Sequence, residues 1–430
     1  MQYKTVISKI VSKQVIETEW KKFMDAEIII IGGGASGLMA AIAAGRKGKK
    51  VILIEQKDRI GKKILATGNG KCNFSNTYQD SRCYRSDNSS FPIKVLERFG
   101  VDETVSWFEN LGILVKERNG YLYPNSLQAS SILDVLRLET ARLGIKVYCE
   151  ERVTKIKEYN QGFRVFLRRR EITGKKIILA AGGKASPQHG SDGSGYLLAE
   201  SLGHHIIPTV PALTGLKVKE GFCGKMAGVR TEAAVSLFIE DKLVSKDIGE
   251  LQLTGYGISG IPVFQVSRYA GKGLLEKKKV TAQIDFFPDR KEEDIWRKLQ
   301  QNIKAHPDDF AEDMLTGIMN KKIYLVLMKE AGIKANAVVK SVPTDKWRKL
   351  SAYMKGLSLH IIDSNGFETA QVTAGGVDTR EINERTMESK LKKNLYMIGE
   401  LLDVDGICGG YNLQWAWSTG FIAGNHAGTD

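Results

Sequence analysis

The apolar positions at the start of the chain follow the pattern of a parallel α/β fold. Residues 27–31 form an uninterrupted β-branched run, residues 35–47 an alanine-rich helical pattern, and residues 51–54 a second apolar run. Strands of parallel sheets are buried on both faces and therefore show continuous apolar runs. This order predicts a strand, a helix and a second, parallel strand joined by a right-handed crossover.

The pattern changes twice further along the chain. Helical and strand-like segments alternate up to about residue 205; they lie at 93–99, 103–111, 129–143, 145–149, 153–156, 162–167 and 176–179. From about residue 206, short alternating runs divided by Gly and Pro predict a small antiparallel sheet or barrel, with strands at 218–219, 233–239 and 280–286. The last part predicts helices at 293–303, 321–331, 344–355 and 413–423 and strands at 357–362, 367–373 and 395–398.

These changes predict two or three structural units in a chain of 430 residues. We expect an N-terminal extension over residues 1–25 and an α/β domain formed by residues 26–205 and 356–430. An inserted substrate domain is expected at 206–355, with the barrel at about 206–288 and a helical part at about 289–355. Met24, just before the first strand, is a possible alternative start, and the residues before it would then be a leader.

Composition places the chain among water-soluble globular proteins of a reducing cytoplasm. Hydrophobic residues make up 42% and charged residues 26% of the sequence. The five cysteines are scattered without a Cys-x-x-Cys pair, which argues against a disulfide framework, a redox dithiol or a zinc site. Apolar runs are too short to span a membrane, and the N-terminus lacks the features of a secretory signal.

The formal net charge of +14 raises the question of a nucleic-acid partner. The basic residues are dispersed, and their densest runs, at 168–170 and 277–279, lie beside expected turns. Basic side chains beside turns keep the ends of strands solvated, so these runs do not require a nucleic-acid partner. We therefore expect no nucleic-acid partner, although the charge keeps RNA binding open as an alternative.

The first chemical motif lies between the first strand and the first helix. Gly32, Gly34 and Gly37 form a G-x-G-x-x-G pattern in the strand–turn–helix context that dinucleotide binding requires. Gly32 permits the tight turn, Gly34 lets a pyrophosphate approach the backbone, and Gly37 allows close helix packing. The helix N-terminus offers unpaired N–H groups to the anion.

Two acidic positions indicate which dinucleotide is bound. Glu55 closes the second strand, where a carboxylate can accept hydrogen bonds from an adenosine ribose; the alternative is a surface charge at a strand end. Asp403 follows Gly399 and Glu400 after the last strand and precedes a glycine-rich loop and the final helix. A carboxylate there can bind ribityl hydroxyls, and the helix N-terminus favours a reduced flavin. The pair predicts FAD rather than NAD as the held cofactor, with helix capping as the alternative role for Asp403.

Residues 61–76 form a long polar loop suited to passing near a ring system or a diphosphate. Their sequence is Gly-Lys-Lys-Ile-Leu-Ala-Thr-Gly-Asn-Gly-Lys-Cys-Asn-Phe-Ser-Asn. Cys72 within it permits flavin–thiol chemistry, but no second cysteine lies nearby. A small packing residue is the interpretation that we favour for Cys72.

Together, the segments 29–37, 66–76, 372–377, 386–390 and 399–414 resemble the YhiN/BaiN-type family of NAD(P)/FAD-dependent oxidoreductases. The resemblance extends from about Ala26 to the C-terminus. It implies a glutathione-reductase-like FAD-binding domain interrupted by a β-barrel and a small helical unit. It also implies reduction of carbon–carbon double bonds conjugated to a ketone in oxo-bile acids. The segment before Met24 departs from the family pattern.

The expected cofactor contacts come from these motifs and from the ends of neighbouring strands. They are Gly32, Gly34, Ala35, Ser36, Gly37, Glu55, Gln56, Lys62, Gly68, Asn69, Gly70, Lys71, Cys72, Asn73, Val153, Ala181, Gly182, Gly399, Glu400, Asp403, Asn412, Leu413 and Gln414.

The remaining polar candidates are histidines and a tyrosine. Tyr411 and His189 are candidate proton donors, with an ordinary loop role as the alternative for each. His204 and His205 are adjacent before an expected strand, so their side chains face opposite ways and we expect no metal site.

The leading hypothesis is an FAD-dependent reductase in which NADH or NADPH supplies electrons for a conjugated C=C bond of a small-molecule, steroid-like enone. The alternatives are a flavoprotein that binds or modifies RNA, and an oxidase that passes electrons to oxygen. The sequence leaves the substrate, the choice of NADH or NADPH and the oligomeric state open.

Overall fold

The computed structural model describes residues 25–429 and divides into two compact units. The first is formed by the residues up to Thr209 and from Gly375 onward, and the second by Val210–Ala374. The expectations for a leader before Met24 lie outside the described residues. None of the helices between residues 25 and 429 has both the length and the hydropathy that a membrane-spanning helix requires.

The first unit is built on a seven-stranded sheet in the order β7-β2-β1-β10-β9-β8, with β19 also paired to β10. Strands β7, β2, β1, β10 and β19 run parallel, whereas β9 and β8 form an antiparallel extension. The bounds are β1 Ala26–Ile31, β2 Val51–Ile54, β7 Lys146–Tyr148, β8 Lys155–Tyr159, β9 Gly162–Phe166, β10 Glu171–Leu179 and β19 Leu395–Met397. Residues 28–30 of β1 are fully buried, as the continuous apolar run predicted.

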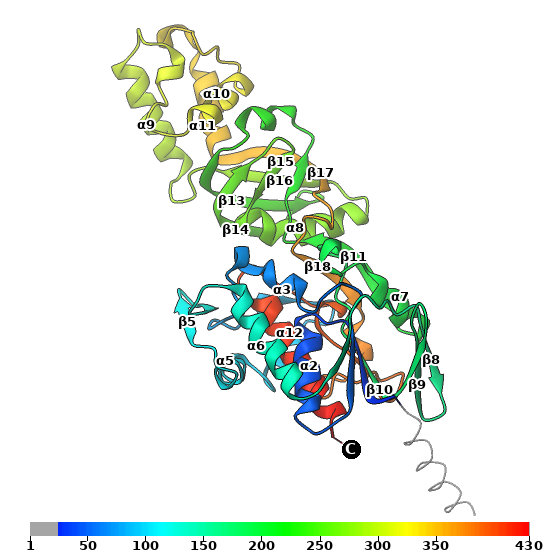
Figure 1. Cartoon of the computed structure of the whole chain (residues 1–430). Helices are drawn as coiled ribbons and strands as arrows, with labels where there is room; N and C mark the ends of the chain where they lie inside the picture. Colours follow the sequence, from blue (N-terminus) through cyan, green and yellow to red (C-terminus); the bar gives the residue numbers. More distant parts are fainter. Residues whose placement is uncertain (1–24, 430) are drawn as a thin grey trace, which may run out of the picture. The chain divides into compact units, whose positions relative to one another are not determined.

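Two helices from opposite ends of the sequence pack closely beside this sheet. Helix α2 (Ala35–Gly45) and helix α12 (Tyr411–Ala427) lie next to each other in blue and red (Figure 1). A Cβ atom placed on Gly420 would stand 2.5 Å from the Ser36 carbonyl oxygen, and one on Gly424 2.3 Å from that of Ala40. Side chains at these glycines would therefore force the helices apart.

Shorter elements complete the first unit around these helices. They are α3 (Lys62–Leu65), α4 (Phe91–Leu96), α5 (Val101–Asn110), α6 (Ala129–Arg142), α7 (Ser194–Ser201), β3 (Ser75–Asn76), β4 (Tyr84–Arg85), β5 (Val115–Arg118), β6 (Tyr121–Pro124) and β20 (Asp405–Gly406). Strand β6 pairs with β3 and β5, and β20 pairs with β4. The core of the unit joins the sheet, α2 and α12 through residues such as Met39, Leu179 and Trp415.

The second unit contains a closed barrel in the order β12-β15-β14-β13-β16-β17. Its strands are β12 (Leu216–Val218), β13 (Arg230–Ile239), β14 (Lys242–Leu253), β15 (Gly257–Gly260), β16 (Val280–Asp285) and β17 (Leu357–Ser364). Helix α8 (Ile261–Leu275) packs against the barrel strands. Helices α9 (Glu292–Ala305), α10 (Lys321–Glu330) and α11 (Thr344–Gly356) gather at one end of the unit (Figure 1).

The chain passes between the units through two strands that pair with each other, β11 (Ile206–Ala212) and β18 (Val372–Val377). The end of the insertion differs from the expected residue 355, because β17 pairs with β12 and β16 and so closes the barrel. The predicted architecture is confirmed: an α/β domain with an inserted β-barrel and a small helical unit.

Candidate functional site

The predicted glycine turn links β1 to α2. Gly32 has a φ of +108°, and a Cβ atom there would stand 2.3 Å from the Ala180 carbonyl oxygen. A Cβ atom on Gly37 would stand 1.9 Å from the Gly32 carbonyl oxygen, whereas one on Gly34 would meet nothing within 4 Å. Gly34 is also the N-cap of α2 and provides no side-chain cap. The turn therefore presents an open, uncapped helix N-terminus, which is the geometry that an anionic diphosphate requires.

Glu55 lies directly after β2 and faces the glycine turn. Its Oε2 accepts the backbone N–H of Gly33 at 2.8 Å, and its Oε1 accepts that of Lys57 at 2.8 Å. Burial raises the pKa of Glu55, while the hydrogen bonds from these backbone groups oppose the rise. The carboxylate is thus held in place at the strand end, as the ribose-binding interpretation requires.

Further expected cofactor contacts follow β2, β7 and β10 in the chain. The Gln56 side-chain amide donates to the Gly190 carbonyl, and the backbone N–H of Glu151 donates to the Glu55 carbonyl at 3.0 Å. Val153 follows in the same loop and is buried. Gly182, just beyond β10, has a φ of +72°, and a Cβ atom there would stand 2.8 Å from the Ser191 hydroxyl oxygen. Ala181 precedes it at the carboxyl end of the same strand.

The polar loop after Glu55 folds into α3 and a short 3-10 turn that includes the left-handed residues Gly68 and Asn69. Lys62 pairs with Asp58 at 2.8 Å. Gly70 and Lys71 end the turn, and Cys72 behind them is fully buried, which raises the pKa of its thiol to about 12. A thiol of this kind is inert, in agreement with a packing role. The buried Oδ1 atom of Asn73 has no hydrogen-bond partner among the described residues.

The C-terminal motif meets this site at the beginning of α2. A Cβ atom on Gly399, whose φ is +67°, would stand 2.5 Å from the Ser36 hydroxyl oxygen. The Gly399 N–H donates to the Thr419 hydroxyl at 3.0 Å, and the Trp415 indole donates to the Gly399 carbonyl at 3.1 Å. Glu400 forms an ion pair with Lys63 at 2.7 Å. The structure thus brings the predicted N-terminal and C-terminal motifs into one constellation.

Asp403 and Asn412 organise the glycine loop before α12. Asp403 is 1% exposed, and its Oδ2 accepts the backbone N–H of Asp87 at 2.8 Å. The Asn412 side chain accepts from the Gly406 N–H at 2.8 Å and donates to the Gly406 carbonyl at 2.9 Å. Gly410, the N-cap of α12, provides no side-chain cap. A second uncapped helix N-terminus therefore lies at the predicted flavin end.

Gln414 and Leu413 begin the same helix but differ in their surroundings. Leu413 is half-buried, whereas Gln414 is fully buried. The Gln414 amide accepts from Ser75 and donates to Gly100, Thr104 and Ser418 at 2.6–3.0 Å. Its side chain thus joins α12 to β3 and α5, and its predicted cofactor contact stays a prediction.

The two candidate proton donors lie at different ends of the constellation. Burial lowers the pKa of His189, and the positive charges of Lys63, Lys62 and Lys57 lower it further. His189 is therefore a neutral imidazole at the lysine-rich, Glu55 end. Tyr411 begins α12 and is 4% exposed; burial raises the pKa of its phenol, and contact with Cys83 raises it further.

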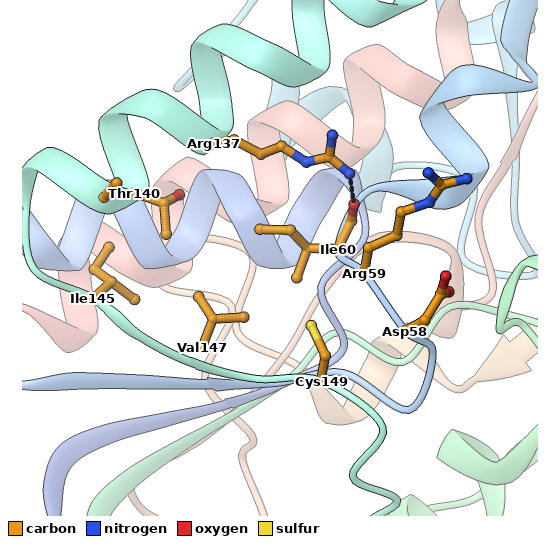
Figure 2. A pocket seen from close by; sticks show the side chains of 9 residues that line it. Asp58, Arg59, Ile60, Arg137, Thr140, Ile145, Val147 and Cys149 are labelled. Atoms are coloured by element: carbon orange, nitrogen blue, oxygen red, sulfur yellow. Dashed lines mark hydrogen bonds between the residues drawn. The ribbon is translucent and has the colours of Figure 1, made fainter.

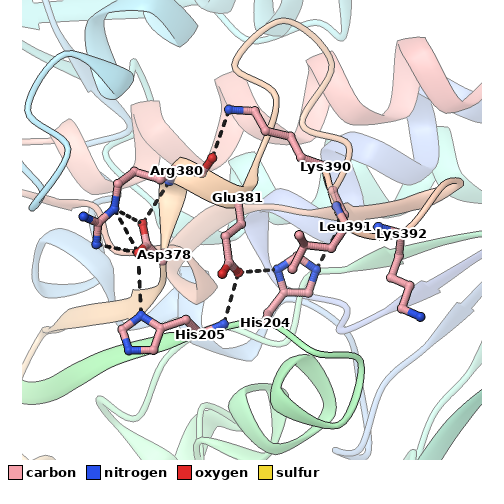
Figure 3. Close-up of polar contacts among 9 residues, drawn as sticks. His204, His205, Asp378, Arg380, Glu381, Lys390, Leu391 and Lys392 are labelled. Atoms are coloured by element: carbon pink, nitrogen blue, oxygen red, sulfur yellow. Dashed lines mark hydrogen bonds and ion pairs between the residues drawn. The ribbon is translucent and has the colours of Figure 1, made fainter.

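His204 and His205 lie directly before β11, and their imidazole rings contact different carboxylates (Figure 3). The buried His204 contacts Glu381 through Nδ1 and Ser389 through Nε2, each at 2.9 Å. The exposed His205 faces Asp378, at 3.6 Å. Within residues 25–429, no group of three His, Cys, Asp or Glu side chains is placed to bind a metal ion.

A pocket of about 450 Å³ lies on the first unit, between the loop after β2, helix α6 and strand β7 (Figure 2). It is lined by Asp58, Arg59, Ile60, Arg137, Thr140, Ala141, Ile145, Val147 and Cys149. Arg137 closes one side by donating to the Ile60 carbonyl at 2.8 Å. None of the predicted site residues lines this pocket, but the pocket adjoins them, because Asp58 pairs with Lys62 and Ile60 lies against the glycine turn at Gly33.

Comparison with known proteins identifies the family of this chain. The family model described as HI0933-like protein Rossmann domain matches residues 26–426. The chain belongs to the HI0933-like family. A 3-dehydro-bile acid delta(4,6)-reductase of Clostridium scindens is 46% identical over 93% of this chain and 98% of the relative. Ribosomal RNA dihydrouridine synthases of Escherichia coli and Haemophilus influenzae are each 30% identical, over 91% and 92% of this chain and 96% and 97% of the relatives.

Membership of the HI0933-like family confirms the predicted resemblance to YhiN/BaiN-type proteins and the interpretation of the chain as an FAD-dependent oxidoreductase.

The structure adds residues that the sequence did not single out in this HI0933-like chain. Lys63, rather than its neighbour Lys62, joins the polar loop to Glu400. Arg85 on β4 lies 3.9 Å from the fully buried Asp405 on β20. Strands β4 and β20 have two residues each, too short for a periodic signal. Only the position of Asp405, two residues after Asp403, could have indicated from the sequence that Asp405 belongs to the site.

Proposed function

We propose that this protein is an FAD-dependent reductase that uses NADH or NADPH to saturate a C=C bond conjugated to a ketone in bile-acid-like or steroid-like enones. The observation that carries the proposal is the 46% identity to the bile acid reductase over almost the full length of both chains. The inserted unit keeps its proposed role as a substrate domain, and the cytoplasm is the proposed location.

The residues of the first unit fit FAD. The open space in front of Gly34 and the uncapped start of α2 suit a diphosphate, and Glu55 at the end of β2 suits a ribose. The uncapped start of α12 would offer donors to the polar edge of a flavin ring, and the Asn73 Oδ1, which has no partner within residues 25–429, would offer an acceptor. When bound, FAD supplies hydride transfer from the nicotinamide to the β-carbon of the enone.

The protein's own residues would position the cofactor and supply the proton to the substrate. Glu55, fixed by two backbone N–H groups, would orient the adenosine, and Lys63 with Glu400 would hold the polar loop against the C-terminal motif. Of the two candidate donors, Tyr411 begins α12 at the expected flavin end, whereas His189 lies among lysines at the expected adenosine end. The α-carbon would receive its proton from the Tyr411 side of the site or from water.

A second candidate is reduction of uridine in ribosomal RNA. Two relatives carry the name ribosomal RNA dihydrouridine synthase, and forming dihydrouridine also saturates a C=C bond conjugated to a carbonyl. Their identity of 30%, against 46% for the bile acid reductase, favours the steroid-like substrate. Binding to RNA would fall steeply with salt, since it depends on phosphate contacts.

Anaerobic stopped-flow spectroscopy of the holoenzyme tests the proposal. The flavin is first bleached with NADH or NADPH and then mixed with a conjugated 3-oxo steroid, with a uridine-containing rRNA fragment, or with oxygen. Rapid reoxidation by the steroid, with a saturated ketone as product, is expected. Reoxidation by RNA alone would establish the second candidate, and reoxidation by oxygen alone, with peroxide as product, would establish an oxidase.

A further inference from the structure

Five tyrosines from three separate segments surround the glycine loop before α12. Tyr411 begins the helix, Tyr84 packs edge-on against it with ring centroids 5.7 Å apart, and Gly406 pairs with Tyr84 across β20 and β4. The rings of Tyr121 and Tyr411 meet at Gly409, where Cε1 of Tyr121 and Cε2 of Tyr411 would each stand 3.1 Å from a Cβ atom. Burial raises the pKa of Tyr411, and the nearby phenols of Tyr121 and Tyr78 raise it further; burial and Tyr121 likewise raise the pKa of Tyr123.

The loop is fixed to the segments that carry these rings. The Asn76 side chain donates to the Gly409 carbonyl at 3.0 Å, and the Ile407 N–H donates to the Cys83 carbonyl at 2.9 Å. Asn76 also pairs with Tyr121 between β3 and β6. The rings are therefore held at defined positions relative to the glycine loop.

Four of the five rings divide into an inner and an outer group, and Tyr123 is half-buried. Tyr84 and Tyr411 are each 4% exposed and belong to the core, while Tyr121 is 40% and Tyr78 54% exposed. The Tyr78 hydroxyl accepts a hydrogen bond from Arg82 at 2.9 Å, which orients its ring. Tyr121 thus presents an exposed ring beside a loop whose Gly409 and Gly410 carry no side chains of their own.

We propose that Tyr121, supported by Tyr78, forms the surface on which a flat fused-ring substrate lies as it reaches the flavin, and that Tyr121 determines specificity for such substrates. This inference rests on the proposed function and on the position of the 406–411 loop at the flavin end. A rigid aromatic face offers a large contact area to a flat apolar skeleton at a low entropic cost. The phenol hydroxyl keeps such a face wettable while the site is empty.

The same geometry distinguishes Tyr121 from Tyr411. Tyr411 is enclosed by Tyr84, Cys83 and the loop, so its ring is held by the protein before any substrate arrives. Tyr121 projects from the first position of β6 with an exposed ring. A substrate at the loop would meet the ring of Tyr121 first.

The test compares Tyr121→Leu, Tyr121→Phe and the control Leu138→Ala, which alters another large exposed apolar side chain of the same unit. Each is prepared as holoenzyme and checked for FAD content. Equilibrium binding of a conjugated 3-oxo steroid, followed by the flavin absorbance spectrum, and KM for its reduction are measured. Tyr121→Leu should weaken binding and raise KM about fivefold to tenfold, in keeping with the loss of one aromatic contact. Tyr121→Phe and Leu138→Ala should match the wild type.

Flavin bleaching by NADH or NADPH and reoxidation by oxygen should be the same in all four proteins. If the wild type binds and reduces the steroid and Tyr121→Leu does so equally well, the inference is overturned and the proposed function stands. Equal losses in Tyr121→Phe and Tyr121→Leu would also overturn it, since the hydroxyl would then be the recognised group. If the wild type fails to reduce any fused-ring enone, the proposed function falls, and the inference falls with it.

Discussion

Gly399 and Ser36, separated by most of the sequence, lie so close that a Cβ atom on Gly399 would stand 2.5 Å from the Ser36 hydroxyl oxygen. The Gly399 backbone has a φ of +67°, a left-handed conformation that disfavours any side chain. Its N–H and carbonyl are both bound by α12, through Thr419 and Trp415. This contact joins the two halves of the predicted FAD site.

Replacing Gly399 with alanine should therefore separate the two motifs. We expect Gly399→Ala to destabilise the protein by about 1–3 kcal/mol, from backbone strain and the contact with Ser36, and to reduce FAD retention. Denaturant unfolding and flavin content measure both effects. Gly255→Ala is the control, because a Cβ atom there meets nothing within 4 Å. Wild-type stability in Gly399→Ala would show that the contact is easily relaxed.

Gly34→Ala should separate cofactor binding from folding. A Cβ atom on Gly34 meets nothing within 4 Å, and its φ of −78° suits alanine, so the apoprotein should keep its stability. The new methyl group would occupy the space through which a diphosphate approaches α2, and FAD affinity should fall about tenfold or more. Titration of the apoprotein with FAD measures this. Unchanged affinity would place the diphosphate elsewhere.

The features predicted correctly from the sequence are those whose residues are close together in the chain. The β1-α2-β2 unit needs only buried apolar runs and three glycines, and the place of Glu55 directly after β2 follows from the end of the second run; its ribose contact stays a prediction. The C-terminal motif was found for the same reason, because Gly399, Asp403 and α12 follow one short strand.

The features that sequence patterns missed depend on packing between distant segments. Helix α8 contains Gly271 and Gly273, which weaken a helical signal. In the structure they allow close contact: a Cβ atom on Gly271 would stand 3.1 Å from Val210, and one on Gly273 2.9 Å from Val280. Strand β17 was assigned to the wrong unit, because its alternating pattern shows that it is a strand and not which sheet it joins.

Glu55→Ala should weaken FAD binding by about one to two orders of magnitude, through the loss of charge-assisted hydrogen bonds of about 1.5–3 kcal/mol to the ribose. Glu55→Gln, which keeps one acceptor, should lose less. Titration of the folded apoproteins with FAD compares them with the wild type. An unchanged dissociation constant in Glu55→Ala would overturn the assignment of the ribose site.

Acidification should weaken FAD binding through the same residue. Burial raises the pKa of Glu55 above its ordinary value of 4.5, so protonation begins at a higher pH than for an exposed glutamate. The protonated group accepts ribose hydrogen bonds less well, and wild-type affinity should therefore fall as the pH is lowered through this raised pKa. In Glu55→Gln that loss should be absent. An equal acid-dependent loss in both proteins would assign the titration to another group.

The stability of the first unit should depend on the ionisation of His204. Burial lowers the pKa of His204 below its ordinary value of 6.5, and the opposing attraction of Glu381 is the smaller effect. The neutral tautomer that satisfies both contacts carries its proton on Nδ1, donates to Glu381 and accepts at Nε2 from the Ser389 hydroxyl. Because the unfolded chain binds this proton more readily than the folded one, stability is full above a pH of about 6.5 and falls as the pH drops from there towards the lower folded pKa.

His204→Asn tests this dependence, because it places an amide near Nδ1 and does not titrate. The difference in free energy of unfolding between wild type and His204→Asn, followed by denaturant unfolding from about pH 7.5 to 5.5, should therefore shrink as the pH falls. His306→Asn, at an exposed histidine of α9's C-terminal end, is the control and should follow the wild type. A constant difference between wild type and His204→Asn across this range would show that His204 keeps its proton equilibrium on folding.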